Sequence, residues 1–175
     1  MKFLVERITS IDLEAFNACF EVCKAEVIGN MPWDRADRAL YTKGVTEDAA
    51  RTWVLARYQE YAARNDDVEG FCFQIKDADS GRVLAIYTAK VDDGALALHL
   101  VMFNNDETGH RSAWLREYFS STTLQDFVVS VGCTKWYQDI FTDGLIDAVG
   151  GDFANDGKLG EGKRRTRIYS SYGWN

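Results

Sequence analysis

The sequence predicts an α/β protein with a central mixed sheet, and three observations support this fold class. Residues 70–103 contain three apolar and aromatic runs separated by the turn sequences ADSG at 78–81 and DDG at 92–94, which is typical of antiparallel hairpins. Two segments with helical spacing of apolar residues precede these runs. A further helical segment separates the third run from another apolar run, and such crossovers usually join parallel neighbours.

The individual elements follow from periodicity and from start and stop signals. Residues 1–9 alternate as a strand does, and Ser10 can cap a helix over 11–28 that Gly29 and Asn30 end. The remaining elements are a helix over 46–64, strands over 70–76, 82–91 and 95–103, a helix over 112–131 that is irregular at 120–123, a strand over 133–141, a short helix over 144–149, and a final hairpin from Phe153 to a basic strand over 164–171. The predicted order is β-α-α-β-β-β-α-β-α-β-β in a single domain, 1–175, with strands 95–103 and 133–141 parallel and splayed apart.

Composition narrows the class of protein. The chain has 175 residues, 46% of them hydrophobic, and a formal net charge of −7, which favours a folded globule and argues against general binding to nucleic acid or to anionic membranes. No apolar run reaches the length of a transmembrane helix. Charged residues appear by position 7, so we expect no secretory signal peptide.

The cysteines point to a reduced interior rather than to a metal site. Cys19, Cys23, Cys72 and Cys133 form no CxxC pair, and the chain has only two histidines to assist them. Cys19 and Cys23 are four residues apart and can face each other on a helix. We therefore expect four free, mostly buried thiols and no bound metal.

Residues 104–111, NNDETGHR, form a loop between a predicted strand and a predicted helix. This arrangement suits a phosphate, because the free N–H groups and the dipole at the N-terminus of the helix point at the loop. Asp106 and Glu107 oppose such a ligand, each by on the order of 1 kcal/mol at surface-like dielectric. His110, Arg111 and the helix amides could offset part of that repulsion.

The order of the elements resembles the GNAT superfamily of acetyl-CoA-dependent N-acetyltransferases, over nearly the whole chain. In that family, the fourth strand ends in a Val-x-Pro-like stretch, and an Arg/Gln-x-x-Gly-x-Gly/Ala loop then binds the pyrophosphate of coenzyme A. Here Val101-Met102-Phe103 matches the strand end, and Gly109 is retained in the loop, but Arg111 replaces the second glycine. The resemblance implies a coenzyme A site at Val101, Phe103, Thr108, Gly109, His110 and Arg111.

The resemblance also implies a general base on the fourth strand and a tyrosine that protonates the departing thiolate. His99 is the one titratable side chain on strand 95–103, and imidazole is a suitable base near neutral pH. A hydrogen-bonded core histidine is the alternative interpretation. The position of the family's tyrosine falls near Ala148 and Val149, so Tyr137 on the next strand is the substitute candidate, unless it belongs to the core.

A second likeness is more specific. The segments ITSIDLEAF at 8–16 and WYQDIFTDGLIDAVGGDF at 136–153 are similar to the GNAT-like internal virion protein of T7-type podoviruses. This likeness implies a non-catalytic virion or assembly component, located in the virion or the host cytoplasm, that needs no cofactor and binds other virion proteins or itself.

Two further stretches could serve such contacts. One is the basic cluster at 163–167, for which a solvated edge strand is the alternative explanation, and the other is the C-terminal SSYGWN with Tyr172 and Trp174. The sequence alone favours the structural role. The competing hypothesis is an acetyl-CoA-dependent N-acetyltransferase that acts on an amine, and a nucleic-acid-binding module is disfavoured by the net charge.

Overall fold

The protein is represented by a computed structural model that describes residues 1–30, 47–104, 114, 117–118, 121–140, 153–154 and 165–170. For residues 25–30, 135, 137–140, 153–154 and 165–170 this description is of the backbone. The expected short helix over 144–149 lies outside these residues.

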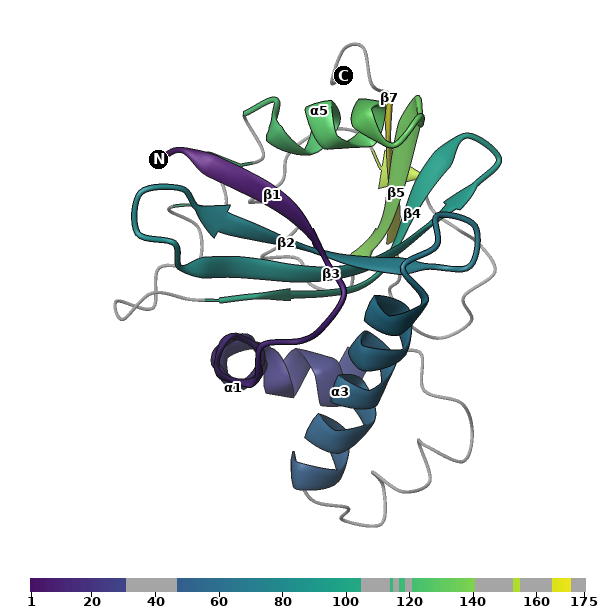
Figure 1. The fold of residues 1–175 in the computed structure, drawn as a ribbon. Helices are drawn as coiled ribbons and strands as arrows, with labels where there is room; N and C mark the ends of the chain where they lie inside the picture. Colours follow the sequence, from purple (N-terminus) through teal and green to yellow (C-terminus); the bar gives the residue numbers. More distant parts are fainter. Residues whose placement is uncertain are drawn as a thin grey trace.

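A twisted mixed sheet is the centre of the described structure (Figure 1). Its strands are arranged in the order β1 (Phe3–Ile8), β2 (Phe71–Asp77), β3 (Val83–Asp92), β4 (Ala95–Phe103), β5 (Lys135–Ile140), β7 (Arg165–Ser170) and β6 (Phe153–Ala154). Neighbouring strands are antiparallel except β4 and β5, which are parallel. The mixed sheet and the parallel crossover predicted from the sequence are therefore confirmed.

The two turns of the central meander use the backbone conformations that their sequences predict. Asp93 has φ +48° and Gly94 has φ +74°, so the turn between β3 and β4 is left-handed at both positions, as hairpin turns with a matching twist require. Gly81, in the turn between β2 and β3, also has a positive φ of +73°. These turns fix β2, β3 and β4 as successive antiparallel neighbours.

Helices cover the two faces of the sheet unequally (Figure 1). Helices α1 (Leu13–Asn30) and α3 (Glu47–Arg64) pack on one face, and α5 (Thr123–Ser130) packs on the other. Helix α1 begins later than predicted, because the Asp12 carboxylate, rather than Ser10, caps it by accepting from the amide of Ala15 at 2.8 Å.

The predicted helix over 112–131 is interrupted in the described residues. Trp114, Glu117 and Tyr118 are helical, but the chain bends at Ser121 and Thr122 before α5 begins. The hydroxyl of Ser121 donates to the carbonyl of Tyr118 at 2.5 Å, and such local bonds compete with the helical pattern. The irregularity expected at 120–123 is confirmed.

The basic cluster was alternatively explained as a solvated edge strand, but β7, which contains part of it, is not at the edge of the sheet. Strand β7 lies between β5 and β6, and Arg167 pairs with Gln138 on one side and with Phe153 on the other. The two-residue strand β6 takes the edge position because it pairs with β7 at Phe153 and Ala154.

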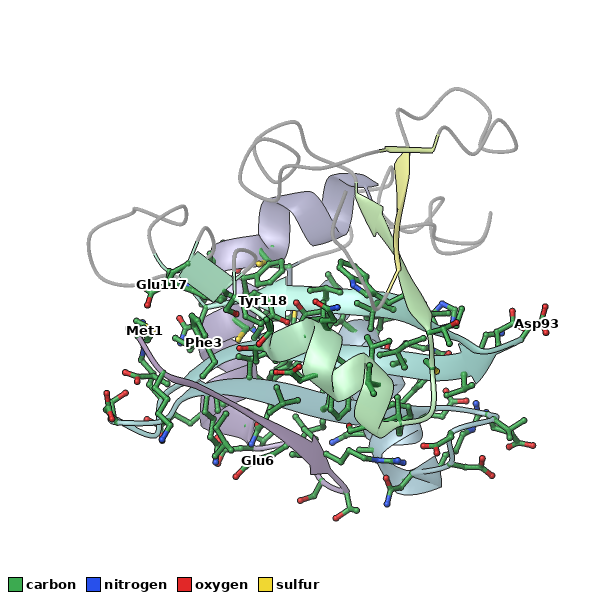
Figure 2. All side chains as sticks on the ribbon, turned by 90° about the horizontal axis from the view of Figure 1, so that it is seen from above. Met1, Phe3, Glu6, Asp93, Glu117 and Tyr118 are labelled. Atoms are coloured by element: carbon green, nitrogen blue, oxygen red, sulfur yellow. The ribbon has the colours of Figure 1, made fainter. Side chains whose placement is uncertain are left out.

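The core is divided by the sheet into two clusters. On the α5 face, aromatic rings dominate, and Phe3 of β1 reaches Tyr118 with ring centroids 5.4 Å apart (Figure 2). On the face of α1 and α3, the rings of Phe16, Phe20 and Tyr58 pack with smaller side chains.

All four cysteines are free and buried, as predicted. Burial raises the pKa of the Cys72 thiol to about 12 and the pKa of the Cys19 thiol further above its ordinary range, so both stay protonated. Among the residues described, no cluster of His, Cys, Asp and Glu could hold a metal ion. No helix in the described part of the chain is both long enough and apolar enough to cross a bilayer.

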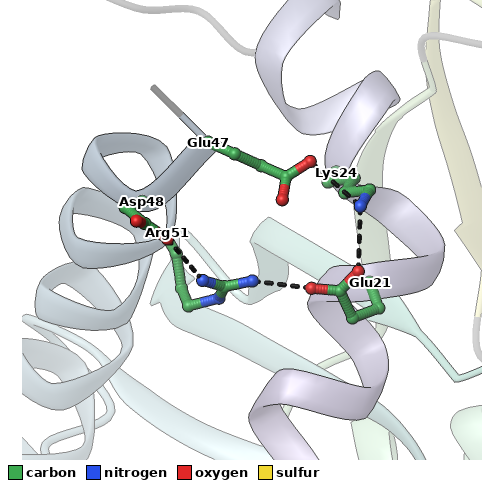
Figure 3. A network of polar contacts seen from close by, with 5 residues as sticks. All are labelled: Glu21, Lys24, Glu47, Asp48 and Arg51. Carbon is green, nitrogen blue, oxygen red and sulfur yellow. Dashed lines mark hydrogen bonds and ion pairs between the residues drawn. The ribbon is translucent and has the colours of Figure 1, made fainter. Parts of the chain in front are cut away.

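An ion-pair network joins the middle of α1 to the first turns of α3 (Figure 3). Glu21 of α1 accepts from Lys24 at 2.9 Å and from Arg51 of α3 at 2.6 Å. Lys24 reaches Glu47 at 2.9 Å, and Arg51 also pairs with Asp48 at 2.9 Å. The network thus links α1 and α3, the helices that precede and follow residues 31–46 in the sequence.

Candidate functional site

Strands β4 and β5 separate partway along their length. Their parallel pairing runs from Ala95 opposite Lys135 to Leu98 opposite Gln138. Beyond this point β4 continues to Phe103, whereas the last two residues of β5 pair with β7 alone. The predicted splaying of the parallel pair is therefore present, and it begins after Leu98.

A β-bulge in β4 lies at the point where the strands part. Tyr87 of β3 pairs with Val101 and Ala89 pairs with Leu98, so His99 and Leu100 together stand opposite the single residue Thr88. The amide of Leu100 donates to the hydroxyl of Thr88 at 2.8 Å, and Thr88 is fully buried. A bulge of this kind bends the strand and re-aims the side chains that follow.

His99 lies at this bulge, on the face of α1 and α3, in an exposed position. Its ring lies beside Tyr61 of α3, with centroids 6.1 Å apart, and α3 ends three residues later at Arg64. Because coverage by the helix ends here, the imidazole stays accessible. The interpretation of His99 as a core residue is therefore wrong, and its role as a base stays a prediction.

Tyr137 lies on the neighbouring strand at the same end of the paired stretch. Its backbone stands opposite Ala97 of β4 and Ile168 of β7. The fold thus brings the backbones of both candidate catalytic residues to adjacent strands, close to the point of separation. The role of Tyr137 stays a prediction, because its side chain lies outside the described part.

Two of the predicted cofactor-binding residues, Val101 and Phe103, pack in or against the hydrophobic core. Val101 is half-buried against the cluster on the α5 face, and Phe103 is 7% exposed and lies 5.8 Å from the Trp114 ring between centroids. The other predicted cofactor residues, Thr108, Gly109, His110 and Arg111, lie outside the described residues.

The two ends of the loop 105–113 are tied together. The indole N–H of Trp114 donates to the carbonyl of Asn104 at 3.1 Å. Asn104 is itself anchored to β3, because its amide N–H donates to the carbonyl of Leu84 at 2.7 Å and its side chain donates to the carbonyl of Val83 at 3.1 Å. A hydrogen bond therefore connects the residue that follows β4 with the helical residue Trp114.

Several residues that shape this region were not identified from the sequence as part of the site. Cys23 of α1 holds the end of β4 through sulfur contacts with the amide and the carbonyl of Phe103, at 3.4 and 3.3 Å. Thr88 supports the bulge, and Tyr61 lies beside His99. Each was assigned to an element, but only the pairing of distant strands and helices brings it to the site.

Comparison with known proteins gives a consistent result for the fold. No family model matches the chain, and no curated protein matches it by sequence. Among solved structures, it is similar to the PaiA N-acetyltransferase of Thermoplasma acidophilum in complex with coenzyme A, with a TM-score of 0.51, 11% identity, and coverage of 97% of this chain and 100% of that one.

Two further structures give similar values. The ribosomal-protein-S5-alanine acetyltransferase of Vibrio fischeri has a TM-score of 0.51 and 12% identity, covering 100% of this chain and 96% of the other. A GNAT-family acetyltransferase of Staphylococcus aureus has a TM-score of 0.51 and 13% identity, covering 97% and 99%. At these identities the likeness is one of fold. The protein therefore has the fold of the GNAT acetyltransferases.

Proposed function

We propose that the protein is an acetyl-CoA-dependent N-acetyltransferase that acts on an amine, with His99 as the general base. The observation that carries this proposal is the exposed imidazole at the bulge where β4 and β5 part. The sequence alone favoured a structural role, since the loop carries Asp106 and Glu107 and has Arg111 in place of the second glycine. The accessible position of His99 shifts the preference to the enzyme.

The separation of the strands suits the shape of coenzyme A. Beyond Leu98, the edge of β4 is no longer paired with β5. An extended ligand with amide groups can bind to such an edge through main-chain hydrogen bonds, and the pantetheine arm has this character. The hydrogen bond between Trp114 and Asn104 would hold the ends of residues 105–113 near the end of β4.

The chemistry requires one proton to leave the amine and one to reach the leaving thiolate. The neutral amine attacks the thioester carbonyl, the new C–N bond forms, and the C–S bond breaks. His99 accepts the proton that the amine nitrogen loses. Tyr137 is the candidate that donates a proton to the thiolate of coenzyme A.

The loop fits a diphosphate less well than the strand edge fits the arm. The helix amides and Arg111 favour an anion, while Asp106 and Glu107 oppose it, each by on the order of 1 kcal/mol. We therefore expect weak binding of acetyl-CoA. The double variant Asp106→Arg, Glu107→Gly should bind it more tightly, because it removes both carboxylates and adds a flexible position.

Calorimetric and thermal-shift titrations with acetyl-CoA test the proposal. Saturation at 100 times the dissociation constant should stabilise the protein by about 2.7 kcal/mol. His99→Ala should retain binding but lose release of the free thiol in assays with a panel of peptide and small-molecule amines. A melting temperature that does not change at millimolar acetyl-CoA would refute the proposal.

A non-catalytic role in a virion or its assembly is the second candidate. The observation that favours it is the pair of acidic residues Asp106 and Glu107 in the loop. None of the similar structures named above is a phage protein, so the likeness to internal virion proteins stays a prediction. Its proposed contact regions, 163–167 with Tyr172 and Trp174, have side chains outside the described part of the chain.

Copurification separates the two candidates. A structural component should be found in phage particles or capsid precursors, or associate with itself, and should bind no acetyl-CoA. Removal of residues 170–175 together with substitution of Arg164 and Arg167 should abolish that association while circular dichroism stays unchanged. A monomer that is absent from particles and acetylates amines would exclude this role.

A further inference from the structure

We infer that Tyr61 is a positioning residue for His99, and that Gly70 is the residue that allows the Tyr61 ring to take its place. The catalytic consequence of this inference rests on the proposed function. The geometric part concerns only the arrangement of the Tyr61 and His99 rings and can be tested without any turnover.

The two rings come from different elements. Tyr61 lies near the C-terminal end of α3, is half-buried, and packs against the cluster under α1 and α3. Its ring centroid lies 6.1 Å from that of His99, with the two planes tilted by 58°. His99 itself belongs to the bulge in β4. The ring of Tyr61 therefore covers one side of the exposed His99 imidazole.

Gly70 determines how closely the Tyr61 ring can approach the sheet. A Cβ atom at position 70 would lie 2.5 Å from both Cδ1 and Cε1 of Tyr61, which no packed structure tolerates. Gly70 also has φ +142°, a conformation that other residues rarely adopt. The ring thus lies directly on the backbone of Gly70, and any side chain there would displace it.

The backbone around Gly70 is fixed by hydrogen bonds and cannot easily retreat. Gly70 and Asp66 exchange two backbone hydrogen bonds, at 2.6 and 2.9 Å. The amide of Val91 in β3 donates to the carbonyl of Asp67 at 2.5 Å, and Arg7 of β1 pairs with the Asp67 carboxylate. The connection from α3 to β2 therefore holds Gly70 in a set position beneath the ring.

A cation lies against the same ring. The guanidinium of Arg64 is 5.7 Å from the centroid of Tyr61 and pairs with Glu60 at 2.6 Å. Arg64 also donates to the carbonyl of Glu69 at 3.4 Å, next to Gly70. Tyr61 is consequently confined by the neighbouring helix residue, by the backbone of Gly70 and by His99.

The ring rather than the hydroxyl carries this role. Burial raises the pKa of the Tyr61 hydroxyl, so the phenol stays neutral in the range where an imidazole ionises. A fixed ring beside His99 reduces the number of imidazole rotamers and keeps the nitrogen aimed at the amine. Orientation of this kind raises the reaction rate because less side-chain entropy is lost when the base takes its reactive position.

Proton NMR of the imidazole signals tests the geometric part. The chain has only two histidines, so the variants His99→Ala and His110→Ala assign both sets of signals. Tyr61→Leu removes the ring current and should move the His99 signals toward those of a free histidine, while Tyr61→Phe should leave them near their wild-type positions. Gly70→Ala should shift them because it displaces the ring. Unchanged His99 signals in folded Tyr61→Leu would overturn the inference.

Trp53→Leu is the matched control. Trp53 is another half-buried ring on α3, but it packs against the guanidinium of Arg57, 5.0 Å from its centroid. Its removal should leave the His99 signals in place. If Trp53→Leu shifts them as much as Tyr61→Leu does, the effect reflects a general disturbance of α3 and the inference is wrong. Circular dichroism confirms that each variant is folded, and Tyr61→Leu decides the matter if Gly70→Ala does not fold.

Kinetics test the catalytic consequence. With acetyl-CoA as the varied substrate, Tyr61→Leu should lower kcat on the order of 10-fold with an unchanged KM for acetyl-CoA, and Tyr61→Phe should restore kcat. Equal losses in the Phe and Leu variants would assign the effect to the hydroxyl and contradict the inference. If the NMR shifts behave as expected but wild-type protein shows no turnover, the positioning of His99 stands and the proposed enzyme function fails.

Discussion

The two faces of the sheet are stabilised in different ways. On the α5 face, rings pack against rings, as where Phe73 stacks on Tyr87 with centroids 4.6 Å apart and meets Phe127 at 4.5 Å. On the face of α1 and α3, buried polar atoms bond to backbone groups, as where Tyr58 donates to the carbonyl of Ile86 at 2.9 Å. The first face supplies packing, and the second fixes the backbone around the bulge that carries His99.

Removal of a central ring from the α5 face should have the largest effect. Phe73→Ala should cost about 3–5 kcal/mol, because a fully buried ring is lost and the surrounding rings cannot close the cavity. Phe16→Ala on the other face should cost less, since its ring neighbours Phe20 and Tyr58 are each 6.0 Å away. Urea unfolding measures both.

Val129→Ala is the control for these substitutions. Val129 is on α5 but is 44% exposed, so its truncation should change the free energy of unfolding by at most about 0.5 kcal/mol. If Phe16→Ala proves more costly than Phe73→Ala, the contrast between a ring-packed face and a hydrogen-bonded face is wrong.

Removal of tyrosine hydroxyls should also change the stability of the two faces differently, by smaller amounts than the loss of a ring. Tyr58→Phe leaves the buried carbonyl of Ile86 without that donor and should cost about 1–2 kcal/mol. On the α5 face, the hydroxyls of Tyr87 and Tyr118 interact with each other, and burial raises the pKa of both. Replacing both tyrosines by phenylalanine should change stability by less than about 1 kcal/mol, because both polar groups disappear together. A larger loss in this pair than in Tyr58→Phe would reverse the comparison.

The ion pairs of Figure 3 should have the smallest effect. Hydrogen bonds from Lys24 and Arg51 lower the pKa of Glu21, while Glu21 and Glu47 raise the pKa of Lys24. The Glu21 contribution is therefore present above its ordinary value of 4.5 and disappears as the pH falls through the lowered value. The Lys24 contribution is present below 10.5 and disappears as the pH rises through the raised value.

Glu21→Gln should consequently cause a small fall in melting temperature at neutral pH that vanishes in acid and in about 1 M salt. Glu69→Gln is the control, since Glu69 is exposed and its carboxylate forms no ion pair with the described residues. A loss that is the same at high and low salt would show that Glu21 acts through packing instead.

Local patterns allowed most of the sheet to be predicted. The Asp-Gly turn at 93–94 requires positive φ at both residues, and its two-residue length sets Asp92 opposite Ala95 in the hairpin. The bend at Ser121 was also visible as a serine and threonine cluster. The start of α1 was misplaced by a few residues, because Ser10 and Asp12 are both good caps and only the fold selects between them.

The site could be predicted only in part. Strict alternation over 95–103 would place Leu100 on the same face as Leu98, but the bulge moves Leu100 to the face of α1 and α3. The hydroxyl that supports this bulge belongs to Thr88, and nothing local distinguishes it from other strand threonines. The contact of Tyr61 with His99 joins a helix and a strand far apart in the chain, so no periodicity could reveal it.

The pairing of the strands also has a consequence for how fast the chain can fold. Strands β2, β3 and β4 are joined by short turns, whereas β1 must find a distant partner, with Phe3 opposite Asp77, and β5 must return beside β4. Non-local contacts form slowly because the loop entropy is lost before they stabilise the chain. We expect the meander of β2 to β4 to form in the folding transition state, with β1 and β5 docking afterwards. Substitutions in the meander should then slow refolding, while those in β1 should mainly accelerate unfolding, in stopped-flow measurements.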